Sequence, residues 1–113
     1  MAAPIFLNKQ ANPAAATLAT LYTVGAGRRA ACSTLVAAET GGNASKIRVH
    51  VCSAGAAGSV GNAIVYDAAL AANSVATFTI GLTVNPTDLV RVQSDTGSVT
   101  FTLFGEETDV PAS

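Results

Sequence analysis

Apolar and polar residues alternate strictly from residue 46 to residue 51, inside the stretch 45–53. A period of two is typical of a strand that turns one face to a core and the other to water. The apolar positions are β-branched, and such stiff side chains lose little freedom on a pleated sheet. The sequence therefore predicts a central strand here. Its inward residues are Ile47, Val49 and Val51, and its outward residues are Lys46, Arg48 and His50.

Shorter runs of the same kind, separated by turns that contain Gly, Asn and Pro, predict six further strands. They span residues 17–23, 28–38, 63–67, 74–80, 88–94 and 98–104. About seven or eight short strands without a convincing helix indicate an all-β protein, and we expect an antiparallel, jelly-roll-like β-sandwich. The expected core between its sheets consists of Leu35, Val49, Val51, Phe78, Val90, Val92, Phe101 and Leu103.

A Gly-Gly-Asn turn joins residues 28–38 to the central strand, which predicts a hairpin. Inward residues must face inward residues across such a pair, so Leu35 is expected opposite Val49. The same register sets Cys32 opposite Cys52 on the other face.

A second hairpin is predicted where a Thr-Gly turn joins residues 88–94 to residues 98–104. In this register Val92 faces Phe101. The alternation and the turn chemistry agree, which favours the pairing.

The two ends of the chain lack this alternation. Residues 1–16 hold two prolines, two asparagines and an alanine run, and we expect an extended N-terminal arm outside the core. The β-sandwich domain is expected at residues 17–105 and an acidic C-terminal tail at residues 106–113. Deleting residues 2–14 should then leave the sandwich folded.

The composition indicates a surface with few charges. The chain of 113 residues is 50% hydrophobic and 12% charged, about half the usual charged share. Few charges keep such molecules apart, so part of the outside is expected to be buried in a homo-oligomer. The net charge of −1 offers no basic field for nucleic acid, and no run approaches the roughly 20 apolar residues of a membrane span. The first residues do not resemble a signal peptide, so we expect synthesis in the cytosol.

The few chemically reactive side chains have ordinary explanations. His50 is expected to be solvated on the polar face of its strand, without an acid to orient it. Cys32 and Cys52 are wrongly spaced for a zinc site. Free thiols are expected in a reducing cytosol, and a disulfide formed after release from the cell is the alternative.

Charged residues at strand ends are expected to shape turns. Asp67, Asp88 and Asp95 fit that role, and no loop has the dense oxygen ligands that calcium needs. Arg28 and Arg29 are expected to begin a strand in solvent, or else to pair with an acidic partner. The sequence therefore predicts no enzyme, no metal and no cofactor.

Four segments together carry a family resemblance. They are residues 20–27 (TLYTVGAG), 46–51 (KIRVHV), 88–92 (DLVRV) and 104–107 (FGEE). Over residues 18–107 the chain resembles small β-sandwich structural proteins of tailed bacteriophages. The resemblance implies a virion protein made in the host cytoplasm, either a capsid cement (decoration) protein or a tail or fibre module.

As a cement protein the chain would bridge neighbouring copies of the major capsid protein, and the resemblance favours a trimer. The arm would supply the possible capsid contacts, which are Pro4, Phe6, Leu7, Lys9 and Asn12. A carbohydrate-binding module is a further alternative, although the chain has no Trp and two Tyr for stacking on sugars.

Overall fold

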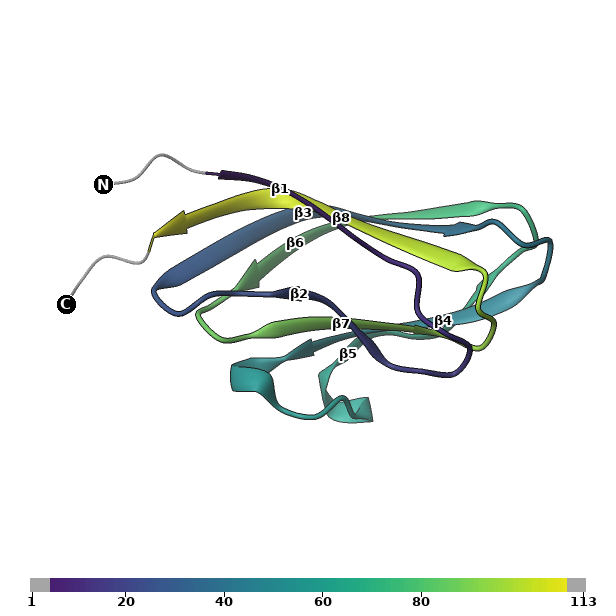
Figure 1. The fold of residues 1–113 in the computed structure, drawn as a ribbon, viewed down its shortest axis with the longest axis horizontal. Coiled ribbons are helices and arrows are strands. Elements are labelled where there is room, and N and C mark those ends of the chain that lie inside the picture. The colour runs from purple at the N-terminus through teal and green to yellow at the C-terminus, as the bar shows by residue number, and fades with distance from the viewer. Residues whose placement is uncertain (1–4, 110–113) are drawn as a thin grey trace.

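The computed structural model describes residues 5–109, within which eight strands form two antiparallel sheets packed face to face (Figure 1). Their bounds are β1 Ile5–Ala11, β2 Ala19–Thr23, β3 Arg28–Glu39, β4 Ser45–Cys52, β5 Ala63–Leu70, β6 Val75–Val84, β7 Leu89–Ser94 and β8 Val99–Asp109. Two short 3₁₀ turns, η1 Ser53–Gly55 and η2 Val60–Asn62, lie between β4 and β5. Neither is long and apolar enough to cross a membrane.

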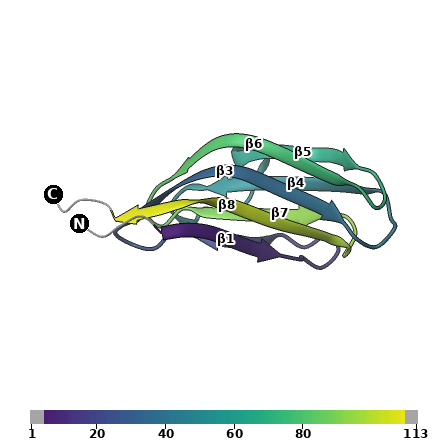
Figure 2. The same ribbon diagram turned by 90° about the horizontal axis from the view of Figure 1, so that it is seen from above.

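The strand order is that of a jelly roll. Sheet A has the order β1-β8-β3-β6 and sheet B the order β2-β7-β4-β5 (Figure 2). Of the connections between the eight strands described, only the one from β4 to β5 stays within a sheet, and the others cross the sandwich. Eight strands wound in this way make the two Greek keys of a jelly roll. The predicted all-β, jelly-roll-like sandwich is confirmed.

Both predicted hairpins are wrong. The strand β3 lies in sheet A and β4 in sheet B, and β7 and β8 are separated in the same way. The short turns between them arch across the sandwich. Consecutive strands therefore turn their apolar faces toward each other through the core instead of sharing hydrogen bonds. In sheet A, Leu35 faces Leu103 on one side and Phe78 on the other.

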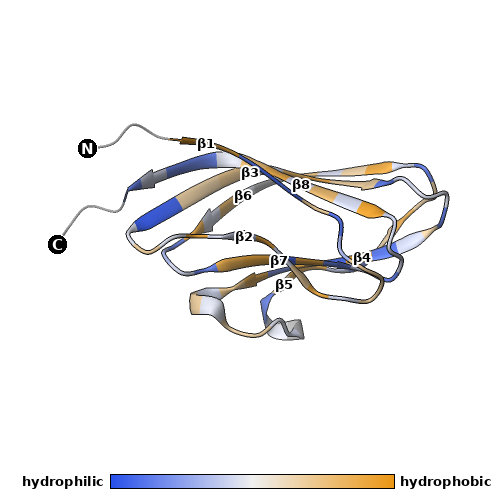
Figure 3. Cartoon of the chain, in the orientation of Figure 1, coloured by the Kyte–Doolittle hydropathy of each residue, from blue (hydrophilic) through white to orange (hydrophobic). Residues whose placement is uncertain are grey.

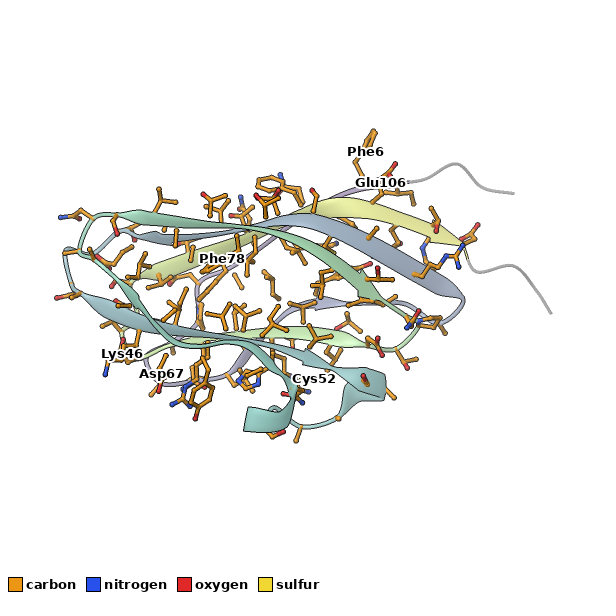
Figure 4. All side chains as sticks on the ribbon, turned by 180° about the vertical axis from the view of Figure 1, so that it is seen from behind. Phe6, Lys46, Cys52, Asp67, Phe78 and Glu106 are labelled. Atoms are coloured by element: carbon orange, nitrogen blue, oxygen red, sulfur yellow. The ribbon has the colours of Figure 1, made fainter. Side chains whose placement is uncertain are left out.

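The predicted core is confirmed. Six of its eight residues are fully buried, namely Leu35, Val49, Val90, Val92, Phe101 and Leu103. Val51 and Phe78 are partly buried and pack against this cluster. In Figure 4 the side chain of Phe78 points into the space between the two sheets.

A β-bulge interrupts β3. Cys32 pairs with Gly105, whereas Thr34 pairs with Phe104, so Ser33 is an extra residue on β3 relative to β8. The buried positions of β3 consequently change from Cys32 on one side of the bulge to Leu35 on the other. A bulge kinks its strand and increases the local twist. Cys32, Ser33 and Gly105, the residues at this bulge, line a groove on sheet A.

The expected arm and tail are partly strands. Within residues 1–16, β1 pairs along its whole length with β8, and Leu7 joins the core. Residues 106–109 of the expected tail belong to β8. Neither end alternates strictly, but the seven residues of β1 satisfy their backbone groups by pairing with β8 at the sheet edge. The domain therefore extends beyond residues 17–105.

Candidate interaction surface

The outer face of sheet A has no charged side chain over most of its area. The strand registers align its outward residues in rows across the sheet. We call this surface the uncharged face, and it consists of Asn8, Gln10, Thr34, Val36, Ala38, Val75, Thr77, Thr79, Thr100, Thr102 and Phe104. All of them are exposed or half-exposed. In Figure 3 the strongly hydrophilic ends of β3 and β8 lie together at one end of the sheet, beyond this face.

An open groove of about 610 Å³ lies at the end of the uncharged face, beside the bulge. Its apolar walls come from Phe6, Leu82 and Phe104, and Glu106 is its charged residue. In Figure 4 Phe6 and Glu106 project away from the sandwich. Gly105 lines the groove where β8 approaches β3 so closely that a Cβ atom would collide with the β3 backbone.

The outer face of sheet B is charged. Arg48 Nε lies 2.7 Å from Asp67 Oδ1, and the guanidinium group lies 4.2 Å from the centre of the Tyr66 ring. The hydrogen bond from Arg48 lowers the pKa of Asp67. Arg48 and Asp67 line a hollow of about 290 Å³ on this face, and Lys46 borders it. The two faces of the sandwich thus differ sharply in charge.

Two of the predicted capsid-contact residues lie in opposite environments on β1. Phe6 is 84% exposed and forms a wall of the groove. Leu7 is buried in the core and is not available to a partner, because alternate residues of a strand point to opposite faces. Pro4 lies outside the described residues.

The other two contact residues have partners within the chain. Lys9 is exposed, with its Nζ 5.9 Å from the centre of the Tyr22 ring. The side-chain amide of Asn12 donates to the carbonyl oxygen of Val99 at 2.9 Å. Of the predicted contacts in the described residues, Phe6 and Leu7 both line the groove, and only Phe6 is exposed there.

His50 is buried, contrary to expectation. Residues 53–62 fold over the outer face of β4, and His50 Nδ1 lies 2.8 Å from the side-chain oxygen of Asn62. That oxygen also accepts the backbone N–H of Ser59. The imidazole therefore anchors the loop that follows β4. Alternation could not reveal this, because the period of a strand does not show where the next loop folds.

The two cysteines do not face each other, because Cys32 lies in sheet A and Cys52 in sheet B. Their expected closeness was derived from the incorrect hairpin. Both are buried free thiols. Burial raises the pKa of Cys32 to about 11, which keeps this thiol protonated near neutral pH.

Asp88 and Asp95 accept backbone N–H groups at strand ends as expected, whereas Asp67 lies inside β5 and its carboxylate pairs with Arg48 instead of shaping a turn. The carboxylate of Asp88 accepts the backbone N–H groups of Ala54 and Asn85, each at 2.9 Å. Asp95 accepts the N–H of Lys46 at 2.8 Å. Residues 5–109 contain no group of three or more side chains placed to hold a metal ion.

Arg28 pairs within the chain rather than standing in solvent. Its guanidinium group contacts Glu107, and its Nη1 lies 2.7 Å from Asp109 Oδ1. The Tyr22 hydroxyl donates to the same Glu107 carboxylate, and burial and this contact raise the pKa of Tyr22. The network ties β2, β3 and β8 together at one end of the sandwich.

Sequence reasoning missed Glu39, a buried carboxylate at the end of β3. It accepts hydrogen bonds from the hydroxyl of Ser98 and from the backbone N–H groups of Gly41 and Asn43. These bonds, led by that of Ser98, lower its pKa from 4.5 to about 2. A Glu two residues before the Gly-Gly-Asn turn was the available signal.

The geometry defines an all-β jelly-roll domain with one charged and one uncharged outer face. No protein-family model and no curated protein matches the chain. It is similar to a solved structure described as "Bacillus endospore appendages form a novel family of disulfide-linked pili". The alignment covers 96% of this chain and 87% of the other, with a TM-score of 0.55 and 20% identity. This likeness is one of fold.

Proposed function

We propose that the protein is a structural subunit of an ordered protein assembly, and that the uncharged face is its main contact surface. The observation that carries the proposal is the absence of charge across the rows of this face, in contrast to sheet B. Interface centres are depleted in charged residues because burying an unpaired charge is costly. A broad uncharged face on a chain with few charges therefore suits burial against a protein.

A fibre-like assembly is favoured among the structural roles. The solved structure with the similar fold is described as a pilus, whose subunits repeat along a filament. That description also mentions disulfide linkage, which does not transfer to this chain. Both of its cysteines are buried and free. The uncharged face proposed as the contact holds no cysteine.

The cement role requires a different partner for the same face. There the uncharged face and Phe6 would rest on the major capsid protein, and a discrete trimer would form instead of a filament. The sequence resemblance to phage structural proteins motivates this alternative. A sugar-binding role is disfavoured, because the Arg48 guanidinium covers the ring of Tyr66 on sheet B.

Light scattering after size exclusion, together with negative-stain microscopy, tests the proposal over a range of protein concentrations. We expect the wild type to form ordered filaments. Thr102→Lys places a charge at the centre of the uncharged face and should abolish them. Thr20→Lys, an exposed change on β2 of sheet B, is the matched control and should not.

The outcomes separate the alternatives. Filaments that survive Thr102→Lys would exclude the uncharged face as the contact. A discrete trimer would support the cement role. A wild-type protein that is monomeric at every concentration would overturn the structural role.

A further inference from the structure

The strand β6 is an edge of sheet A that carries no charge. Its ten residues, VATFTIGLTV, pair with β3 on one side and with no strand of residues 5–109 on the other. The uncharged stretch extends over residues 68–87. An edge strand presents unpaired N–H and C=O groups, and these are a template for another strand.

The other three edges are protected. Lys9 lies on β1, and a charge on an edge strand opposes pairing. The strand β2 is only five residues long, and its register with β7 is irregular. In β5, Asp67 adopts a φ of 54°, and the register with β4 shifts twice. Short strands and irregular registers blunt an edge in the same way. The register of β6 with β3 also shifts once, between Thr79 and Leu82, so β6 is distinguished by its ten-residue length and its lack of charge.

The side chains of β6 suit a strand partner. Val75 is 60% exposed, and Thr77, Thr79 and Thr83 are exposed on the outer side. Phe78 points inward and is only partly buried (Figure 4). A partner strand would cover Phe78 and continue the uncharged face. Thr and Val are also favourable cross-strand neighbours.

We propose that β6 pairs antiparallel with β6 of a second copy about a twofold axis. A charge-free edge can meet itself without repulsion, and twofold contacts are the commonest between identical chains. With Thr79 opposite Thr79, Thr77 faces Gly81 and outward residues face outward residues. The two copies of sheet A then form one eight-stranded sheet.

This pairing deepens the proposed function, because it names a second copy as one partner and makes the two uncharged faces continuous. It uses the backbone edge of β6, whereas the larger assembly uses the face. The two contacts can therefore be separated by substitution. The Thr102→Lys protein, whose face contact is blocked, isolates the edge contact.

Light scattering of the Thr102→Lys protein should give twice the chain mass of 11.2 kDa. Adding Thr79→Lys should return the monomer mass, because like charges directly opposite destabilise a strand pair. Adding Thr23→Lys instead, on the exposed side of the β2 edge, should leave the dimer intact. Circular dichroism checks that each variant is folded.

A Thr79→Cys variant locates the pairing. Cys32 is 1% and Cys52 0% exposed, so the introduced thiol is the accessible one. A short bis-maleimide should link two copies through it. Failure to link, or a dimer that survives Thr79→Lys, would overturn the edge pairing. Edge-paired dimers without filaments in the wild type would overturn only the proposed function. Wild-type filaments together with a monomeric Thr102→Lys protein would overturn only the edge pairing.

Discussion

The carboxylate of Glu39 connects two loops at one end of the sandwich. Its partners lie on the turn after β3, through Gly41 and Asn43, and on the turn before β8, through Ser98. A buried carboxylate is stable only with such donors around it. One residue thus fixes the geometry of two arches that cross between the sheets.

Glu39 should make stability depend on pH. Its folded pKa of about 2 lies below the ordinary 4.5, so its contribution is complete above pH 4.5 and is lost as the pH falls toward 2. Glu39→Gln removes an acceptor and faces an amide NH₂ toward donors, which should lower the urea midpoint at pH 7. The difference from the wild type should shrink at pH 3. An equal difference at both pH values would contradict this assignment.

Phe101 is the largest fully buried side chain of the core. Phe101→Ala should lower the free energy of unfolding by about 3–5 kcal/mol, because a cavity adds to the lost transfer energy. Phe104→Ala on the same strand is the control, since Phe104 is 39% exposed. Urea denaturation measures both. Similar losses for the two variants would contradict the assignment of the faces of β8.

At the scale of elements, the period of two identified which face of a strand is buried but not which strand lies beside it. Val92 and Phe101 are both buried as expected, yet their strands lie in opposite sheets. A short polar turn can close a hairpin or arch over a core, and local chemistry does not distinguish the two. The bulge at Ser33 was also invisible, because it depends on both neighbours of β3.

The strand β1 provides a test at this scale. Leu7→Ala should lower the free energy of unfolding by about 2–5 kcal/mol, whereas Phe6→Ala should change it little, because only Leu7 is buried. Deleting residues 2–14 should likewise destabilise the sandwich, since it removes a strand of sheet A. Thermal melts followed by circular dichroism measure all three. A deletion protein as stable as the wild type would contradict the role of β1 in the sandwich. It would support the expectation that residues 1–16 form an arm outside the core.

At the scale of the whole molecule, the uncharged face was only half visible in the sequence. The run without charges at residues 68–87 could have been noticed, as could the alternating Thr residues of β8. These residues form one surface because β8, β3 and β6 are neighbours in sheet A. The sequence of the turns did not show which strands are neighbours. Phe6 was named as a contact, but Phe104 and the groove depend on that same adjacency.

The assembly should respond weakly to salt. The uncharged face holds no ion pair to screen, although the Debye length falls from about 10 Å at 0.1 M to about 3 Å at 1 M. Burial of Val, Ala, Phe and Thr methyl groups should be strengthened by sulfate and weakened by cooling. Sedimentation velocity in NaCl, in ammonium sulfate and at low temperature measures these responses. If NaCl alone dissociated the assembly, the charged face with Lys46 and Arg48 would be the contact, because only attractions between charges are screened over this range.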